Sequence, residues 1–474
     1  MCKWKHGLII PAYLLISVFF CSYCSSQLPC TEFITQKIYI KGNEKAKEKI
    51  ILFEAGLNQG ESIPVNEFLP RIEKAEANLK RTGLFSGVNI TYLLDIDSSC
   101  QIEITITLVE NWLLFPTIIL ETVDRNFNVW WKEFNHDLNR LNYGLGVAHN
   151  NLTGIRDRLK GKLARGYSNK YEAAYYRSYL GKSMKMDALL EMSYIESRET
   201  GYTLSDSRVQ FFSIPGENVQ KRMYFNYGLS HRTNRENRWG FKNTFEQYKI
   251  SDSLAIQSKD YLLDGSNKQQ FIQLIFNRNY NNLNHFIEPT AGWYVDVTSR
   301  MFLLRAKESH QYWNVGFHIE NAKKIKNRIR YQGTLQGFTS FIRKKMPFNL
   351  YTGIGTGEIR LDGYEFYLIS GMDYILTRQS LYYKLFQFQR NIIKIFKDEP
   401  KIKVLISSEA VIRLGTGFVN DPYYKNLNSL ANTSLASISA GLQFGINGIL
   451  KLELNYSVNH RNEKGIYFHT SRLF

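Results

Sequence analysis

Alternation of apolar and polar residues is the strongest pattern in the carboxy-terminal three quarters of the chain. It is clearest in residues 450–459, where leucine, tyrosine and valine alternate with lysine, glutamate, asparagine and serine. Residues 436–446 and 223–230 alternate in the same way. A period of two residues predicts β-strands with one apolar and one polar face. Runs of about ten residues match the length of a tilted strand that crosses a bilayer.

The region from residue 112 to 474 therefore predicts a membrane barrel. It has no apolar run long enough for a spanning helix, and no helical segments to cover so many one-sided strands. An exported chain whose backbone lies in lipid must satisfy its edge groups by closing the sheet. At about 22 residues per strand with its connection, the length allows roughly 16 strands. The predicted fold is mainly β, with a transmembrane antiparallel β-barrel at 112–474.

Residues 28–111 predict a small α/β domain ahead of the barrel, with the element order β-α-α-β-β. Apolar residues recur at helical spacing between residues 68 and 79, and strict alternation marks residues 101–108. The expected elements, in chain order, are a strand at 33–40, a helix at 44–55, a helix that ends at Gly83, and strands at 88–94 and 102–108.

The first 26 residues predict a cleaved secretory signal. Two lysines precede an apolar run at 7–20, and the small residues Cys24 and Ser26 occupy the −3 and −1 positions before Gln27. Lipoprotein cleavage at one of two nearby cysteines is the alternative, which the bulky residue before each cysteine disfavours. An exported protein does not meet nucleic acid, so the net charge of +17 points to an anionic membrane surface.

Composition narrows the class further. Aromatic residues make up 14% of the chain, which favours strands and membrane interfaces. The mean hydropathy of −0.31 excludes a polytopic helical membrane protein. Hydrolase, metalloprotease and phosphate-binding motifs are missing, and the nine histidines are scattered. We therefore expect neither an enzyme nor a cofactor nor a metal site.

Two cysteines, Cys30 and Cys100, remain after the predicted signal. In an oxidising compartment they can form a disulfide, which closes a long loop and would contribute about 4 kcal/mol in the chain-entropy model. Two unpaired thiols are the alternative.

The segment 28–111 resembles a POTRA domain, the periplasmic polypeptide-binding module of outer-membrane assembly proteins. The matching features are Gly42-Asn43, the Gly60-Glu61 step, and Leu79 followed by Gly83-Leu84-Phe85. One such unit before a barrel of the bacterial surface antigen type resembles the BamA/TamA superfamily of outer-membrane assembly and translocation proteins. An unrelated small α/β domain is the alternative for this segment.

The resemblance also implies a loop that folds back into the barrel lumen with an Arg-Gly-Tyr or Arg-Gly-Phe tip. The similar tip here is Asp362-Gly363-Tyr364, in which aspartate replaces the arginine. The matching wall segment carries Arg413 where the family has an acid. These complementary departures predict a charge-swapped pair, and exchange of both residues is expected to restore what each single change loses. In the alternative, Arg360 is the loop arginine and Arg413 is one lumen charge among many.

The end of the chain resembles the carboxy-terminal signal by which outer-membrane proteins are recognised for assembly. It contains Phe468 and ends on Phe474.

The function implied by the resemblance is insertion of barrel proteins into the outer membrane, or passage of polypeptide across it. The route is a weakly paired seam between the first and last strands, expected near 112–122 and 465–474. Implied partners are unfolded outer-membrane or exported polypeptides, accessory periplasmic proteins, outer-membrane lipid and lipopolysaccharide. The POTRA-like domain is expected in the periplasm. A passive pore or structural barrel is the alternative, which barrel size and alternation fit equally well.

Overall fold

The computed structural model describes most of the chain and leaves out its two ends. The predicted signal at 1–26 and the terminal Phe474 lie outside the described residues. The chain divides into two compact units, with the boundary between Asn111 and Trp112. The described residues are 30–95, 100–181, 183–234, 236–284, 288–305, 309–357, 359–392, 402–446 and 450–472.

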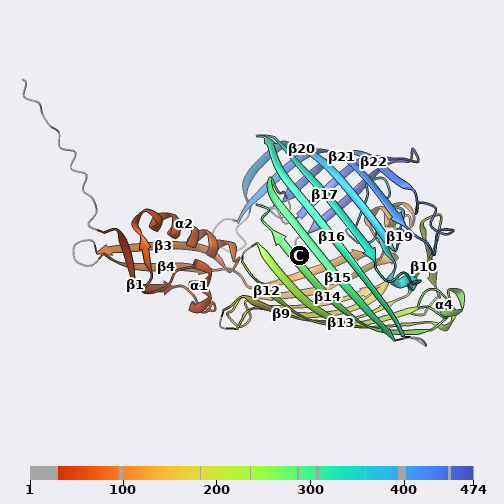
Figure 1. Cartoon of the computed structure of the whole chain (residues 1–474), viewed down its shortest axis with the longest axis horizontal. Coiled ribbons are helices and arrows are strands. Elements are labelled where there is room, and N and C mark those ends of the chain that lie inside the picture. The colour runs from red at the N-terminus through yellow and green to blue at the C-terminus, as the bar shows by residue number, and fades with distance from the viewer. Residues whose placement is uncertain are drawn as a thin grey trace, which may run out of the picture. The chain divides into compact units, whose positions relative to one another are not determined.

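The amino-terminal unit contains a four-stranded sheet and two helices (Figure 1). Its elements are β1 (Glu32–Lys41), α1 (Glu48–Ala55), β2 (Ser62–Pro64), α2 (Val65–Arg81), β3 (Phe85–Asp95) and β4 (Gln101–Glu110). The strand order is β2-β1-β4-β3, in which β1 runs parallel to β4 and β3 forms one edge.

The core of this unit is formed by the apolar residues that recur at helical spacing in α2 and at spacing two in β4. The apolar positions of α2 at helical spacing are buried, as are the apolar positions of β4 at spacing two. These buried residues are Phe68, Ile72, Ala75, Leu79, Ile102, Ile104, Ile106 and Leu108.

Two details of the unit differ from the expected order β-α-α-β-β. The first helix begins at Glu48 and not at Glu44, because composition does not locate a helix start to within one turn. A strand, β2, also lies between the helices and pairs antiparallel with β1. It has three residues, too few to show an alternation in the sequence.

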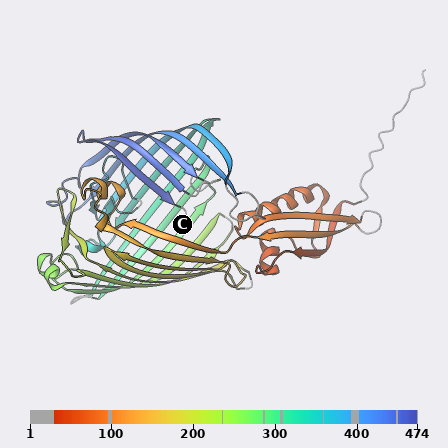
Figure 2. The same cartoon turned by 180° about the vertical axis from the view of Figure 1, so that it is seen from behind.

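The carboxy-terminal unit is a 16-stranded antiparallel sheet that curves into a barrel (Figures 1 and 2). The predicted mainly β fold with an antiparallel barrel of about 16 strands is therefore confirmed. Its strands are β5 (Leu114–Thr122), β6 (Leu141–Asn150), β7 (Arg158–Gly166), β8 (Ser168–Leu180), β9 (Met186–Ser197), β12 (Gln220–Arg232), β13 (Asn237–Ile250), β14 (Lys268–Asn281), β15 (Ala291–Arg305), β16 (Ser309–Lys326), β17 (Ile329–Ser340), β20 (Asp373–Ile392), β21 (Ile402–Asn420), β22 (Ser434–Ile446), β23 (Leu450–Asn459) and β24 (Lys464–Arg472).

Neighbouring strands of the barrel follow each other in the chain, and shorter elements lie in their connections. The sheet ends at β5 on one side and β24 on the other. No ladder joins these two strands within the described part of the chain. The short elements are α3 (Phe127–Lys132), η1 (Leu138–Arg140), β10 (Glu199–Ser205), β11 (Arg208–Ser213), α4 (Asp252–Gln257), η2 (Phe348–Leu350), β18 (Thr352–Ile354) and β19 (Ile369–Gly371).

Burial in the barrel is the reverse of that in a soluble sandwich. In β23 the apolar Leu454 and Tyr456 are 50% and 48% exposed, whereas Glu453 and Asn455 are 2% and 1% exposed. The apolar face therefore points outward and the polar face inward, as expected for a barrel surrounded by lipid. Among the described residues, no helix combines the length and apolarity needed to cross a membrane.

Cys30 and Cys100 form a disulfide in the amino-terminal unit. The two cysteines precede β1 and β4, and Ile34 pairs with Gln101 where these parallel strands begin. The disulfide therefore joins the starts of two central strands.

Replacement of both cysteines, as in Cys30→Ser/Cys100→Ser, is expected to lower the free energy of unfolding of this unit by about 4 kcal/mol, because the unfolded chain regains the entropy of an open loop. Urea titration of the full chain in detergent, read by pulse proteolysis of the amino-terminal unit, measures this change. Dithiothreitol should destabilise the natural chain to the same extent and leave the double variant unchanged. Equal stability of both proteins would contradict the prediction.

Candidate functional site

The connection between β17 and β20 forms the centre of the candidate site. We call residues 341–372 the lumen loop, because their tip lies against inward-facing residues of the barrel wall. Leu361, Asp362 and Tyr364 at the tip are each at most 2% exposed. A buried loop tip needs specific partners for its polar groups.

Gly363 and Tyr364 fix the shape of the tip. Gly363 has φ +83°, a left-handed conformation that glycine adopts without strain. Its carbonyl accepts a hydrogen bond of 2.9 Å from Asn459 Nδ2 at the end of β23. The Tyr364 hydroxyl donates to the Ala436 carbonyl over 3.1 Å and also contacts His460. The tip is therefore bound to the β22–β23 side of the wall.

Arg413 on β21 lies at the centre of the contacts between the tip and the wall. It donates to Asp362 Oδ2 of the tip, and its Nη1 lies 2.9 Å from Glu453 Oε1 on β23. Its Nε donates to Ser380 Oγ on β20 over 3.1 Å. Ser439 Oγ on β22 donates to Asp362 over 2.6 Å. We call these five residues the Arg413 cluster.

The structure thus brings together Asp362 and Arg413, the two residues of the predicted charge-swapped pair. Arg360 has a separate position, with its Nη2 3.7 Å from Glu453 Oε1. Asp362 therefore pairs with Arg413 and Arg360 with Glu453, and Glu453 is shared between the two arginines. Burial alone would raise the pKa of the Asp362 carboxyl, but Arg413 and Arg360 hold it below its ordinary value.

The absence of a side chain at one wall position, Gly415, makes room for the tip. Gly415 follows Arg413 by two residues and faces the same side of β21. A Cβ built at Gly415 would lie 2.4 Å from Leu361 Cδ1. The wall segment 411–415 therefore contributes both a charge and a gap for the loop.

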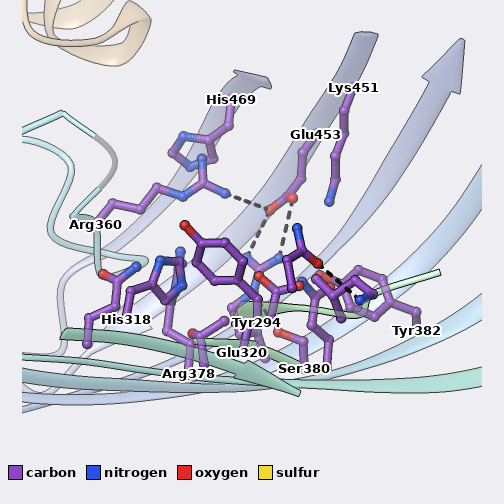
Figure 3. A pocket seen from close by; sticks show the side chains of 16 residues that line it. Tyr294, His318, Glu320, Arg360, Arg378, Ser380, Tyr382, Lys451, Glu453 and His469 are labelled. Atoms are coloured by element: carbon purple, nitrogen blue, oxygen red, sulfur yellow. Dashed lines mark hydrogen bonds and ion pairs between the residues drawn. The ribbon is translucent and has the colours of Figure 1, made fainter. Parts of the chain in front are cut away.

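A polar cavity of about 470 Å³ lies beside the Arg413 cluster (Figure 3). Its charged lining contains more basic than acidic residues, so it suits water, anions or an acidic chain segment. The charged lining residues are Glu320, Arg360, Arg378, Arg413, Lys451 and Glu453.

The first connection of the barrel holds the opposite side of the lumen loop. Arg125 donates to the Tyr367 carbonyl over 2.6 Å and to the Phe366 carbonyl over 3.1 Å. Asn126 donates to the Glu365 carbonyl over 2.8 Å, while its own Oδ1 accepts from Val129 N and caps α3. A helix cap thus also acts as a clamp on the loop.

The same connection reaches the last strand through Asn128. Its Nδ2 donates to the Phe468 carbonyl over 3.0 Å, and its Oδ1 accepts from Phe468 N over 2.8 Å. In an antiparallel ladder, the N–H and C=O of one residue point to the same side. These groups of Phe468 therefore point away from β23, toward the unpaired edge of β24. Phe127 packs on the Phe468 ring at 5.1 Å.

Several of these residues were not identified from the sequence. Alternation on β23 places Glu453 on the polar face, but it does not reveal which lumen charge it meets. Asn128 has no motif, because its role depends on the position of α3 beside β24. The sequence also did not predict the contact between Glu365 Oε1 and His469 Nε2 at 3.2 Å, which joins the lumen loop to the last strand.

Comparison with known proteins finds a family match within the barrel region. A family model described as the Omp85 superfamily domain matches residues 151–373. No curated protein matches the chain.

Similar solved structures share the fold at low sequence identity. BamA from Haemophilus ducreyi lacking POTRA domains 1–3 has a TM-score of 0.57 and 16% identity, over 92% of this chain and 84% of that chain. CdiB from Escherichia coli has a TM-score of 0.56 and 14% identity, over 93% and 76%. CdiB from Acinetobacter baumannii has a TM-score of 0.51 and 11% identity, over 93% and 74%.

Arg413 contacts a second carboxylate, that of Glu453, in addition to Asp362. This contact changes the outcome expected when the charges at positions 362 and 413 are exchanged. Asp362→Arg or Arg413→Asp alone should cost about 3–5 kcal/mol, because each leaves buried like charges together. The double exchange should recover only part of this loss, since the new aspartate at 413 faces Glu453. Adding Glu453→Gln should recover more. Thermal unfolding of the purified barrel, read by heat-modifiable gel mobility, measures all four variants.

Full recovery in the double exchange would show that Glu453 contributes nothing. No recovery in either the double or the triple variant would show that the contact between positions 362 and 413 is not what stabilises the loop.

Proposed function

Since the chain carries an Omp85 superfamily domain, we propose that it is an outer-membrane barrel that inserts barrel proteins into the membrane or moves polypeptide across it. The route is a lateral seam between β5 and β24. The client is an unfolded outer-membrane or exported polypeptide.

The observation that carries this proposal is the missing ladder between the two end strands, within the described residues. An unpaired strand edge is a template on which an extended chain adds by backbone hydrogen bonds, with little demand on its sequence. At Phe468 this edge of β24 is met by one side chain, Asn128, and not by a strand. A side chain is easier to displace than a ladder, which suits an edge that admits a client.

The amino-terminal unit fits a POTRA-like role in the periplasm. Its strand β3 forms one edge of the sheet, with Leu93 73% exposed near its end. An extended polypeptide can pair with such an edge before it reaches the barrel. Accessory periplasmic proteins are proposed to meet the same unit.

The outer surface and the charge fit the proposed membrane. Outward apolar side chains suit the hydrocarbon layer, and the net charge of +17 suits lipopolysaccharide phosphates or anionic head groups.

A passive pore is the second candidate, and the polar cavity of about 470 Å³ is the observation that favours it. The lumen loop disfavours a wide channel, because the Arg413 cluster binds the tip of the loop to the wall.

Cysteine pairs scanned along 114–122 and 464–472 test the proposal in cells, with Cys30 and Cys100 replaced by serine. Disulfides across the seam are expected to form at rest when thermal motion brings the two unpaired edges together. They should fall when a stalled barrel client is expressed, while crosslinks between client and β24 rise, because the client takes the edge.

The matched control is Tyr456→Cys/Ile466→Cys, which joins residues paired across the intact β23–β24 ladder. Its crosslink should not respond to the client. A seam that stays crosslinked to the same extent and captures no client would favour the passive pore.

A further inference from the structure

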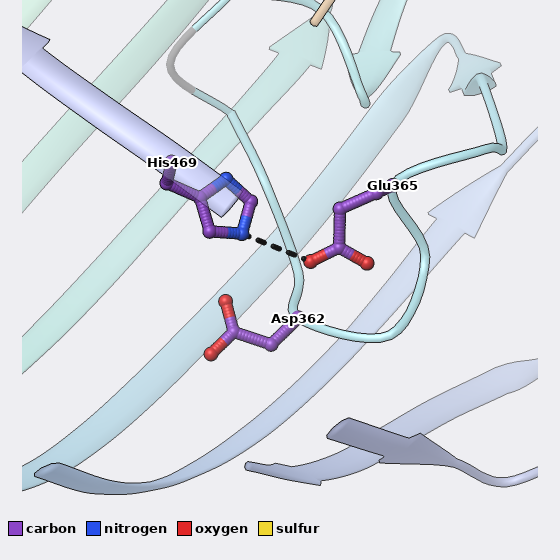
Figure 4. A group of neighbouring side chains, drawn as sticks. All are labelled: Asp362, Glu365 and His469. Atoms are coloured by element: carbon purple, nitrogen blue, oxygen red, sulfur yellow. Dashed lines mark hydrogen bonds and ion pairs between the residues drawn. The ribbon is translucent and has the colours of Figure 1, made fainter. Parts of the chain in front are cut away.

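Three buried side chains with metal-binding chemistry meet where the lumen loop approaches the last strand (Figure 4). Asp362 and Glu365 come from the loop, and His469 comes from the lumen face of β24. One possible ligand atom of each lies within 4.8 Å of those of the other two. Their side chains are 3%, 3% and 8% exposed.

Both carboxylates have an oxygen that the described residues leave without a hydrogen-bond partner. These atoms are Asp362 Oδ1 and Glu365 Oε2. A buried carboxylate oxygen without a partner is costly, so such groups are normally paired or bound to a metal. Glu365 is the clearer case, because its side chain has His469, at 3.2 Å, as its one hydrogen-bond or ion-pair partner among the described residues. The protein contacts therefore leave an unmet requirement for positive charge or donors at this point.

We propose that Asp362, Glu365 and His469 form a binding site for one divalent transition-metal ion, with zinc as the favoured ion. Imidazole nitrogen together with two carboxylate oxygens is a donor set that zinc and similar ions take, with water in the remaining position. Calcium and magnesium are disfavoured because they take oxygen ligands and avoid imidazole.

The spacing requires only a small contraction. Around tetrahedral zinc with bonds near 2.1 Å, ligand atoms lie about 3.4 Å apart. The Glu365 and His469 atoms already lie 3.2 Å apart. The loop backbone is held, so Asp362 has to approach from within the 4.8 Å separation by rotation of its side chain.

The groups around the site support the ligands and also limit affinity. Arg413 and Ser439 hold Asp362 through Oδ2, which leaves Oδ1 available. Such outer hydrogen bonds orient a ligating carboxylate. The same guanidinium repels a cation, as does Arg360 nearby, so the affinity should be lower than in a site without arginines.

The site would join two parts of the barrel that are far apart in sequence. A bound ion connects the lumen loop to β24 on the lumen side of its unpaired edge. This inference rests on the three side chains alone and holds whether the chain transports polypeptide or is a passive barrel.

Calorimetric titration with zinc chloride tests the site in the full chain, purified in detergent without a histidine tag and freed of metal with EDTA. We expect one saturable zinc ion per chain. Glu365→Gln and His469→Gln should each weaken zinc binding at least tenfold. Cobalt should report the same site by its visible absorption.

Glu320→Gln and His318→Gln are matched controls, because both residues line the same lumen cavity outside the proposed site. They should leave the affinity unchanged, and heat-modifiable mobility verifies that every variant is folded. If His469→Gln does not fold, Glu365→Gln alone decides. Absence of one-equivalent binding, or equal affinity in all folded variants, would overturn the proposal and leave water as the occupant.

Discussion

The requirement that buried charges be paired governs the interior of this barrel. Arg413 is 5% exposed and projects from the wall into a space that the lumen loop also enters. Left alone, its charge would carry a desolvation cost of several kcal/mol. It is balanced by Asp362 from the loop and Glu453 from the wall. Because one of these two acids belongs to the loop, departure of the loop would remove one of the two carboxylates on Arg413 and leave Glu453 as the other.

The other contacts of the loop depend on that anchor. With the tip fixed at Asp362, Tyr364 reaches the β22–β23 side, and the backbone of residues 365–367 faces the first connection. Arg125 and Asn126 then bind three successive carbonyl groups of the loop. The loop is thus held from two sides, by side-chain charge on one and by backbone hydrogen bonds on the other.

The sequence patterns predicted which face of each strand a residue lies on, but not which residue it contacts. Alternation identified the barrel and put Arg413 and Glu453 on its polar side, because a period of two distinguishes only two faces. The resemblance to a known loop then selected Asp362 as a partner for Arg413. Glu453 lies two strands away from Arg413, and this proximity depends on strand stagger, which alternation does not encode. The contact of Glu365 with His469 spans about a hundred residues and has no local signal.

The last strand is held differently on its two edges, and this difference bears on the proposed opening of the seam. Toward β23, β24 has a regular ladder over residues 464–472. At Phe468 its other edge is held by the amide of Asn128, whose two neutral hydrogen bonds are worth about 1 kcal/mol each. His469 adds a contact to the lumen loop from the inward face. In the proposed function, an incoming strand would therefore compete with a few side-chain contacts from the lumen loop and the first connection. The position of the lumen loop and the freedom of the β24 edge are consequently coupled through Asn126, Asn128 and Glu365.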